Sequence, residues 1–306
     1  MKKLKNKNMK KTFVLLSFCV ISLTLFAQTA SDYLEKAKAG DVAAQMALGE
    51  CYEKGLGVSK DARTAFQWYK KAAKQGSAEA QYKLGQCYKK GNEWLAVDFD
   101  AALEWIRKSA NQGYAPAERE LGYCYESANG VAQDKSAAIK WFRKAADNGD
   151  AEAQFIMGNR YRKGEGVPKN SAMAAYWYLK AAEQGHASSQ YNLGNRFKKG
   201  GDVPQNDSLA VYWYSKAAEQ GHYGAQYALG RCYFRGEGVP QNDSLAVYWL
   251  TKAAEQGDDK AQYYLGKCYM DGRGVEKDES IAKSWIKKSV NRGYDKAIEY
   301  AKKQGW

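Results

Sequence analysis

The chain has 306 residues, of which 45% are apolar and 13% aromatic, and its formal net charge is +13. This composition provides enough apolar side chains for packed cores, which excludes an intrinsically disordered or a collagen-like chain. Residues 1–27 contain six lysines and no acidic residue, so the remainder of the chain has a net charge of +7.

The first 27 residues have the order of a secretory signal peptide. A basic stretch from Lys2 to Lys11 precedes an apolar run from Phe13 to Phe26 and the small residue Ala27. The apolar run is shorter than the roughly 20 residues that a membrane-spanning helix needs. We therefore expect an exported protein, periplasmic or secreted, without membrane insertion after signal cleavage. An uncleaved membrane anchor is the alternative.

An internal repeat extends through the rest of the chain. A glycine recurs at intervals of 36 or 37 residues, at Gly49, Gly85, Gly122, Gly158, Gly194, Gly230 and Gly266. A tryptophan recurs with the same period, at Trp68, Trp105, Trp141, Trp177, Trp213, Trp249 and Trp285. The chain therefore contains seven copies of one unit.

Each copy is expected to form two helices joined by a turn that contains glycine. In the sixth copy, Ala225, Leu229 and Cys232 have helical spacing, and the segment Gly236–Pro240 interrupts the pattern. A second helix then begins after an Asp or Asn whose side chain can accept hydrogen bonds from the first-turn amides. The expected capping residues are Asp61, Asp100, Asp134, Asn170, Asn206, Asn242 and Asp278.

A single helix pair of this kind cannot bury its apolar stripe alone, so neighbouring pairs must stack. The predicted fold is therefore all-α, a right-handed α-solenoid. Its expected parts are a signal peptide at 1–27, a capping helix at 28–40, seven repeats at 41–293 and a capping helix at 294–306.

The two halves of the repeat resemble a known family. The first half reads A-Q-Y-A-L-G-R-C-Y at residues 225–233, and the second reads N-D-S-L-A-V-Y-W-L-T-K-A-A-E-Q-G at residues 242–257. Over residues 32–305 the chain is similar to Sel1-like repeat proteins, which are relatives of the tetratricopeptide repeat family. The resemblance implies a superhelix whose first helices line a concave face, a scaffold role in binding other proteins, and no catalytic residues. The second copy departs from the pattern, with one extra residue in its turn, Gly91–Val97.

Five cysteines of the expected mature chain occupy one position of the repeat: Cys51, Cys87, Cys124, Cys232 and Cys268. Equivalent positions of adjacent first helices lie at least about 8 to 10 Å apart, whereas disulfide-bonded Cα atoms lie within roughly 7 Å. We therefore expect free thiols that behave as small, semi-buried apolar residues. A cysteine-rich branch of the Sel1-like family has two bridged cysteines in each repeat, and this chain lacks the second one.

The sequence lacks the motifs of the common catalytic and metal sites. It contains no H-E-x-x-H, G-x-S-x-G, phosphate-binding loop or C-x-x-C pattern. Its two histidines, His186 and His222, follow equivalent repeat glycines, which is typical of duplicated loop residues. Most of the 23 tyrosines recur at repeat positions where packing explains them. We expect no catalytic residue, no cofactor, no metal and no nucleic-acid partner.

On one face of the first helices the residues differ from copy to copy, whereas the residues beside this face stay the same. Packing between helices therefore does not require particular residues on this face. The varying positions lie three, four and seven residues apart, which places them on one side of a helix. We expect this side to bind an acidic segment of a protein or peptide partner through charge-assisted hydrogen bonds. An ordinary solvated lysine-rich face is the alternative. The predicted partner-binding residues are Asn159, Arg160, Lys163, Asn192, Asn195, Arg196, Lys199, Arg231, Arg235 and Lys267.

The leading functional hypothesis is an exported, non-enzymatic scaffold or adaptor that holds a partner segment. One alternative is a hydrolase acting on cell-wall or beta-lactam substrates, and the missing nucleophile and base motifs disfavour it. Another alternative is a secreted factor that contacts host or neighbouring cells, which differs from the leading hypothesis in location only.

Overall fold

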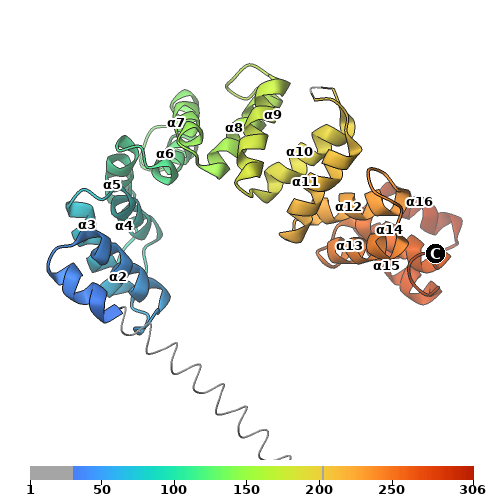
Figure 1. Ribbon diagram of the computed structural model, residues 1–306, viewed down its shortest axis with the longest axis horizontal. Coiled ribbons are helices and arrows are strands. Elements are labelled where there is room, and N and C mark those ends of the chain that lie inside the picture. The colour runs from blue at the N-terminus through green and yellow to red at the C-terminus, as the bar shows by residue number, and fades with distance from the viewer. Residues whose placement is uncertain (1–29, 202) are drawn as a thin grey trace, which may run out of the picture. The chain divides into compact units, whose positions relative to one another are not determined.

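A computed structural model describes residues 30–201 and 203–306 of the chain. The regular structure in these ranges is helical, with one isolated bridge between Asn92 and Leu95 as the exception. The predicted signal peptide at 1–27 lies outside the described residues. A helix over residues 30–38 precedes the helices that Figure 1 labels.

Each repeat contributes two helices, as the sequence pattern predicts, and each of these helices has 13 residues. The first helices are α2 (Val42–Lys54), α4 (Ala78–Lys90), α6 (Ala115–Ser127), α8 (Ala151–Lys163), α10 (Ala187–Lys199), α12 (Tyr223–Arg235) and α14 (Asp259–Asp271). The second helices are α3 (Ala62–Lys74), α5 (Phe99–Asn111), α7 (Lys135–Asp147), α9 (Ser171–Glu183), α11 (Asp207–Glu219), α13 (Asp243–Glu255) and α15 (Glu279–Asn291). A shorter helix, α16 (Asp295–Lys303), follows the last repeat.

Six of the seven predicted capping residues of the second helices are confirmed, and Asp100 is wrong. Asp98 caps α5 and accepts a hydrogen bond from the Ala101 amide at 2.9 Å. The Asp98 amide donates to the Tyr88 carbonyl, as the Asp134 amide does to Tyr125 in the next repeat. This backbone bond sets the cap position. The extra residue of the second repeat lies before the cap. The other caps lie three residues after a valine of the turn, as Asp134 follows Val131, and the same count from Val97 gives Asp100 instead of Asp98.

The helices form two compact units, Met1–Asn148 and Gly149–Trp306, here called unit 1 and unit 2. Within each unit, the second helix of a repeat packs against its own first helix and against the first helix of the next repeat (Figure 1). The core lies between these helices. In unit 2, for example, Tyr214 and Ala217 of α11 pack with Leu229 and Cys232 of α12. The fold is the predicted all-α solenoid arrangement of stacked helix pairs.

A row of buried glutamines connects successive repeats, and we call it the glutamine ladder. Gln226 of α12 donates its Nε2 to the Ala218 carbonyl at the end of α11, at 3.2 Å. Its Oε1 accepts from Nε2 of Gln256, which follows α13, at 2.8 Å. Gln45, Gln81 and Gln190 make the same two hydrogen bonds. Gln262 makes only the donor bond, to the Ala254 carbonyl. The buried members are Gln45, Gln81, Gln154, Gln190, Gln226 and Gln262, with Glu118 at the same position of the third repeat.

All five described cysteines are free, and only Cys87 is not fully buried. Burial raises the pKa of the Cys232 thiol to about 11 and that of Cys268 to about 12. Because the thiolate is the nucleophile, we expect iodoacetamide at pH 7 to modify Cys87 first and the buried thiols only after unfolding. Mass spectrometry of alkylation with and without urea measures this order. Equal rates at all five cysteines in the folded protein would contradict it.

Candidate functional site

All ten predicted partner-binding residues lie in unit 2, on the first helices α8, α10, α12 and α14. The structure places Asn192, Asn195, Arg196 and Lys199 around one pocket between the fourth and fifth repeats. Asn195 and Arg231 also line a smaller pocket between the fifth and sixth repeats. The other five predicted residues line neither pocket: Asn159, Arg160, Lys163, Arg235 and Lys267.

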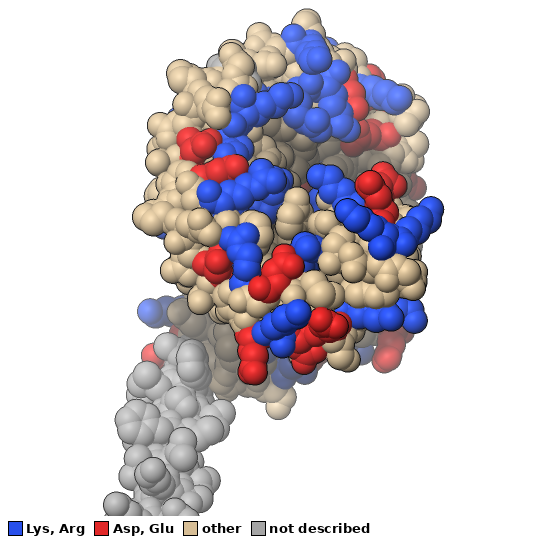
Figure 2. Space-filling model, turned by 90° about the vertical axis from the view of Figure 1, so that its right-hand side faces the viewer, with Lys and Arg blue, Asp and Glu red and all other residues tan. Residues whose placement is uncertain are grey.

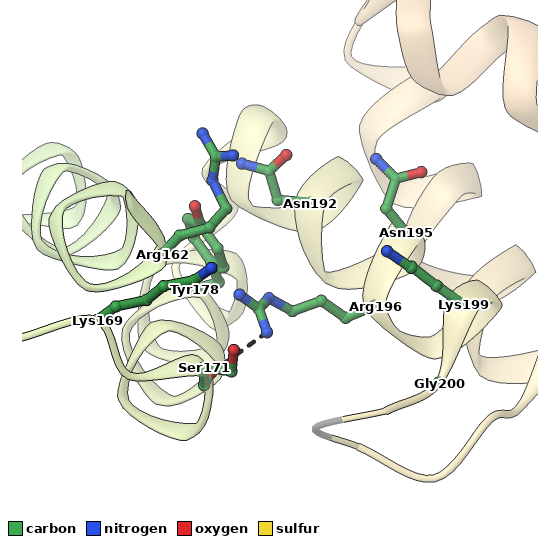
Figure 3. Close-up of a pocket in the computed structure, with 9 residues that line it drawn as sticks. All are labelled: Arg162, Lys169, Ser171, Tyr178, Asn192, Asn195, Arg196, Lys199 and Gly200. Carbon is green, nitrogen blue, oxygen red and sulfur yellow. Dashed lines mark hydrogen bonds between the residues drawn. The ribbon is translucent and has the colours of Figure 1, made fainter. Parts of the chain in front are cut away.

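The first of these pockets has a volume of about 550 Å³, and we call it the cationic pocket. Its nine lining residues come from the end of α8, the turn before α9, α9 itself and α10, and none of them is acidic (Figure 3). Four are positively charged. Neither Lys169 nor Lys199 forms an ion pair with a carboxylate in the described structure. The lining residues are Arg162, Lys169, Ser171, Tyr178, Asn192, Asn195, Arg196, Lys199 and Gly200.

Arg196 has a central place in the cationic pocket. Its side chain extends from α10 toward the start of α9, where Nη1 donates to the Ser171 carbonyl at 3.2 Å (Figure 3). The guanidinium lies 5.4 Å from the ring centroid of Tyr178. Burial, together with the positive charge of Arg162, lowers the pKa of Arg196. Both causes penalise the charged form, so an anion entering the pocket would remove an unfavourable interaction.

Several predicted residues outside the pocket already have acidic partners in unit 2. Arg160 and Lys163 both lie near Glu165, at 3.4 and 3.2 Å. Lys267 pairs with Asp271 at 3.3 Å. Exposed pairs of this kind contribute little stability, but they reduce the positive charge offered to a ligand. Among the described residues, Lys199 of the cationic pocket differs from these three in having no ion pair.

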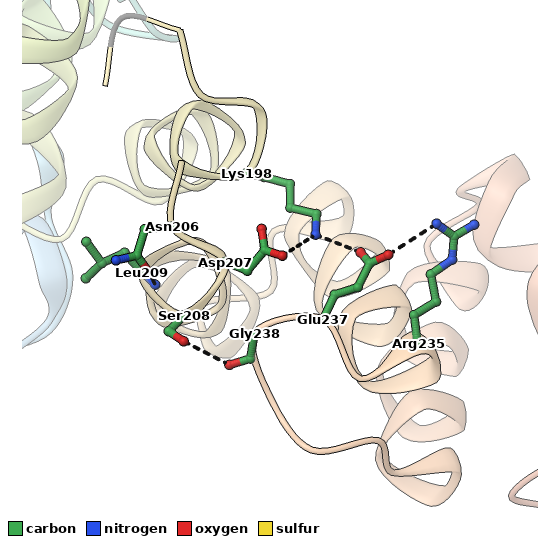
Figure 4. Close-up of polar contacts among 8 residues, drawn as sticks. All are labelled: Lys198, Asn206, Asp207, Ser208, Leu209, Arg235, Glu237 and Gly238. Atoms are coloured by element: carbon green, nitrogen blue, oxygen red, sulfur yellow. Dashed lines mark hydrogen bonds and ion pairs between the residues drawn. The ribbon is translucent and has the colours of Figure 1, made fainter. Parts of the chain in front are cut away.

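Positive side chains near the ends of α10 and α12 are also paired with carboxylates of the same unit. Lys198 lies between Asp207, at 3.2 Å, and Glu237, at 2.7 Å (Figure 4). Arg235, one of the predicted residues, contacts the same Glu237 at 3.4 Å. These hydrogen-bonded ion pairs raise the pKa of Lys198 and lower the pKa of Glu237. This cluster connects the fifth and sixth repeats and leaves Arg235 less available to a partner.

Two cationic residues of the pocket, Arg162 and Lys169, are absent from the sequence prediction. The position of Arg162 varies among the copies as strongly as the chosen positions do, with Glu53 in the first copy and Lys198 in the fifth. This variation among the copies is the signal from which Arg162 could have been predicted. Lys169 lies in the turn after α8, which a search restricted to helix faces does not include. On the face of the molecule in Figure 2, basic side chains predominate and acidic ones are scattered among them.

The histidines do not form a catalytic site. His186 Nε2 lies 3.0 Å from Glu152, and Nδ1 lies 2.9 Å from the Ser189 hydroxyl. This grouping has the composition of a hydrolase triad, but Ser189 is completely buried and no substrate can reach its oxygen. His186 and His222 instead cap α10 and α12. Among the residues that the structure describes, no cluster of His, Cys, Asp or Glu is suited to hold a metal ion.

We expect His222 to make the stability of unit 2 dependent on pH. Its Nδ1 accepts from the Ala225 amide at 3.2 Å, which requires the neutral ring, and burial lowers its pKa below the usual 6.5. The unfolded chain therefore binds more protons, so this stabilisation is complete above about pH 6.5 and is lost as the pH falls through the folded-state pKa. We expect the free energy of unfolding to fall less between pH 7.5 and 5.5 in His222→Asn, because asparagine caps without titrating. Urea titrations at the two pH values test this, and equal decreases would contradict it.

The comparisons with known proteins agree with the repeat geometry. The Sel1 repeat family model matches residues 42–77, 78–114, 115–150, 151–186, 187–222, 224–258 and 259–294. The chain belongs to the Sel1 repeat family. Proteins of this family are commonly protein-interaction scaffolds, and the Sel1 repeat fold is typically non-catalytic. No curated protein matches the chain.

Two solved structures of this family are similar over most of the chain. One is c5321, a protective antigen of uropathogenic Escherichia coli, with 36% identity, a TM-score of 0.77 and coverage of 89% of this chain. The chain spans 58% of the length of c5321. The other is a Sel1 repeat protein from Oxalobacter formigenes, with 33% identity, a TM-score of 0.63 and coverage of 90% of this chain and 79% of that one. In residues 30–201 and 203–306, no helix is long and apolar enough to cross a membrane.

Proposed function

We propose that this Sel1 repeat protein is an exported, non-enzymatic scaffold that binds an acidic segment of a partner protein on the first-helix face of unit 2. The observation that carries the proposal is the cationic pocket, where four positive side chains meet and none of the described lining residues is a carboxylate. Such a concentration of one sign of charge attracts oppositely charged ligands and speeds their association. Arginine side chains also form bidentate hydrogen bonds with carboxylates. Export is supported by the signal-peptide pattern of residues 1–27.

The repeat architecture supports a scaffold more than an enzyme. The described residues that line the pocket include no carboxylate, histidine or cysteine, which are common general bases and nucleophiles. The pocket volume of about 550 Å³ is within the range of ligand sites, and it can accept several side chains of a bound segment. The site therefore has the means to bind and orient an anionic chain.

A charge-reversal experiment tests the proposal. The probe is a fluorescein-labelled peptide of six glutamates, and binding to the mature protein is measured by fluorescence anisotropy. We expect Arg196→Glu with Lys199→Glu to weaken binding at least tenfold, because two attractive charges at the pocket become repulsive. The affinity of the wild type should also fall as the salt concentration rises.

The matched control is Lys216→Glu with Lys252→Glu, which changes the net charge equally but lies on α11 and α13, away from the cationic pocket. This variant should retain affinity within about threefold. Equal losses in both variants would show that only net charge attracts the peptide. No binding to the wild type would overturn the assignment of an acidic partner.

A further inference from the structure

Two asparagines of the predicted face are held by buried tyrosines of the following helices. The Tyr178 hydroxyl donates to Asn159 Oδ1 at 2.7 Å, and the Tyr214 hydroxyl donates to Asn195 Oδ1 at 2.8 Å. Both tyrosines are nearly inaccessible, and burial raises their pKa values, so the hydroxyls stay protonated and remain donors. Each asparagine oxygen is therefore occupied and its amide orientation is restrained.

The amide nitrogens of these asparagines remain available. Neither Asn159 Nδ2 nor Asn195 Nδ2 donates a hydrogen bond to another residue in the described structure, and neither atom is buried without a partner. An amide NH₂ group carries two donors. Each asparagine therefore presents two neutral N–H donors, whose direction is restrained by the tyrosine that it contacts. These donors lie on the same face as the cationic residues.

This arrangement is restricted to the fourth and fifth repeats. The other copies carry different residues at the asparagine position, namely Glu50, Gln86, Tyr123, Arg231 and Lys267. The same two repeats have arginine, Arg160 and Arg196, where the other five have cysteine. Packing of the solenoid does not require the asparagine and tyrosine pair, because five repeats fold without it. Two adjacent repeats have therefore diverged together from the common pattern.

The two donors lie on the first helices of adjacent repeats, α8 and α10, so one chain that crosses both helices would meet them with different peptide units. Adjacent first helices lie at least about 8 to 10 Å apart, and an extended chain advances roughly 3.3 Å per residue. Carbonyl groups on one side of an extended segment recur every second residue, so carbonyls four residues apart, roughly 13 Å, satisfy this minimum separation. Asn195 also lines the cationic pocket, so a main chain bound there would bring its side chains next to Arg196 and Lys199.

We propose that Asn159 and Asn195 donate hydrogen bonds to main-chain carbonyls of an extended partner segment whose acidic side chains enter the cationic pocket. The inference rests on the proposed function and adds the conformation in which the segment is recognised. Charge selects the segment, and the two asparagines fix its direction and register. Tyr178 and Tyr214 are positioning residues, since each acts through the asparagine that it holds.

The test uses the hexaglutamate peptide and a second peptide in which ester bonds replace the main-chain amides, because an ester carbonyl is a weaker acceptor. We expect Asn159→Ala with Asn195→Ala to bind hexaglutamate about tenfold more weakly, with an unchanged salt dependence, since neutral donors are lost. The ester peptide should bind the wild type less tightly than the amide peptide, and this difference should disappear in the asparagine variant. Circular dichroism checks that the variant keeps its helical content.

A second variant, Tyr178→Phe with Tyr214→Phe, keeps both asparagines but removes their restraint, and we expect a loss of a few fold. Hexaglutamate binding that is lost in Arg196→Glu with Lys199→Glu but unchanged in the asparagine variant would overturn this inference and leave the proposed function standing. An equal ester penalty in wild type and asparagine variant would also overturn it. Failure of hexaglutamate to bind the wild type would overturn both.

Discussion

Replacement of Gly238 by alanine is expected to lower the free energy of unfolding of unit 2 by about 3 kcal/mol. Gly238 has φ of +77°, and a Cβ added there would lie 2.3 Å from the Asp207 carbonyl oxygen and 2.5 Å from its carbon. Both contacts are to backbone, so no side-chain rotation relieves them. The turn of the sixth repeat would have to move away from the start of α11, and the Ser208 hydroxyl would lose its bond to the Gly238 carbonyl (Figure 4).

The control for this substitution is Gly221→Ala. Gly221 has a similar φ of +88°, but a Cβ there would meet nothing within 4 Å. The left-handed conformation alone should destabilise this variant by about 1 kcal/mol. Urea unfolding followed by circular dichroism compares the two proteins. Equal effects would mean that the turn accommodates the Cβ of residue 238 and that the close approach to Asp207 does not constrain the sequence.

Gln226→Ala is expected to destabilise unit 2 by about 2 to 3 kcal/mol. The substitution removes a fully buried amide that joins the Ala218 carbonyl to Gln256. Two hydrogen bonds would be lost, although the Ala218 carbonyl keeps its bond from the Gly221 amide and the exposed Gln256 keeps its bond to the Gly221 carbonyl. The change also leaves a cavity between α11 and α12. Thermal and urea unfolding of the variant measure the loss.

Two further variants test whether the lost stability comes from the hydrogen bonds of the glutamine ladder or from the removal of a buried side chain. Gln256→Ala removes only the outer partner and should have a smaller effect, so a double variant with Gln226→Ala should lose less than the sum of the two changes. Glu118→Gln should stabilise unit 1 by about 1 kcal/mol. Glu118 is buried and accepts from Asn148 at 2.8 Å, but a carboxylate cannot donate to a carbonyl as Gln81 does to Ala73. A destabilising Glu118→Gln would contradict this account.

The period of the repeat, the helix pairs and most of the caps were predictable because local chemistry determines them. Helical spacing, glycine turns and Asp or Asn caps act within a few residues, and seven copies repeat each signal. The error at Asp100 has the same local origin. The second copy contains one extra residue before the cap, and the hydrogen bond from Asp98 to Tyr88 confirms this placement. Asp98 also precedes Trp105 by seven residues, as the caps of the other copies precede their tryptophans.

Basic and asparagine-rich positions on α8 and α10 were also predictable, because comparison among copies distinguishes residues that packing requires from those it does not. Their use as a partner site stays a prediction. The sequence by itself could not show which of these charges remain uncompensated. Whether a lysine faces a carboxylate, as Lys163 does, or a pocket without one, as Lys199 does, depends on neighbours supplied by other helices and turns.

The sequence therefore determined the solenoid, the start of six of the seven second helices and the basic character of one face. The tertiary structure alone decided the cationic pocket, the restrained asparagines and the glutamine ladder. The physical reason is the number of residues that separate the interacting groups along the chain. Arg196 meets the Ser171 carbonyl across 25 residues, and Gln226 meets Gln256 across 30, so stacking of repeats must occur before these groups can interact.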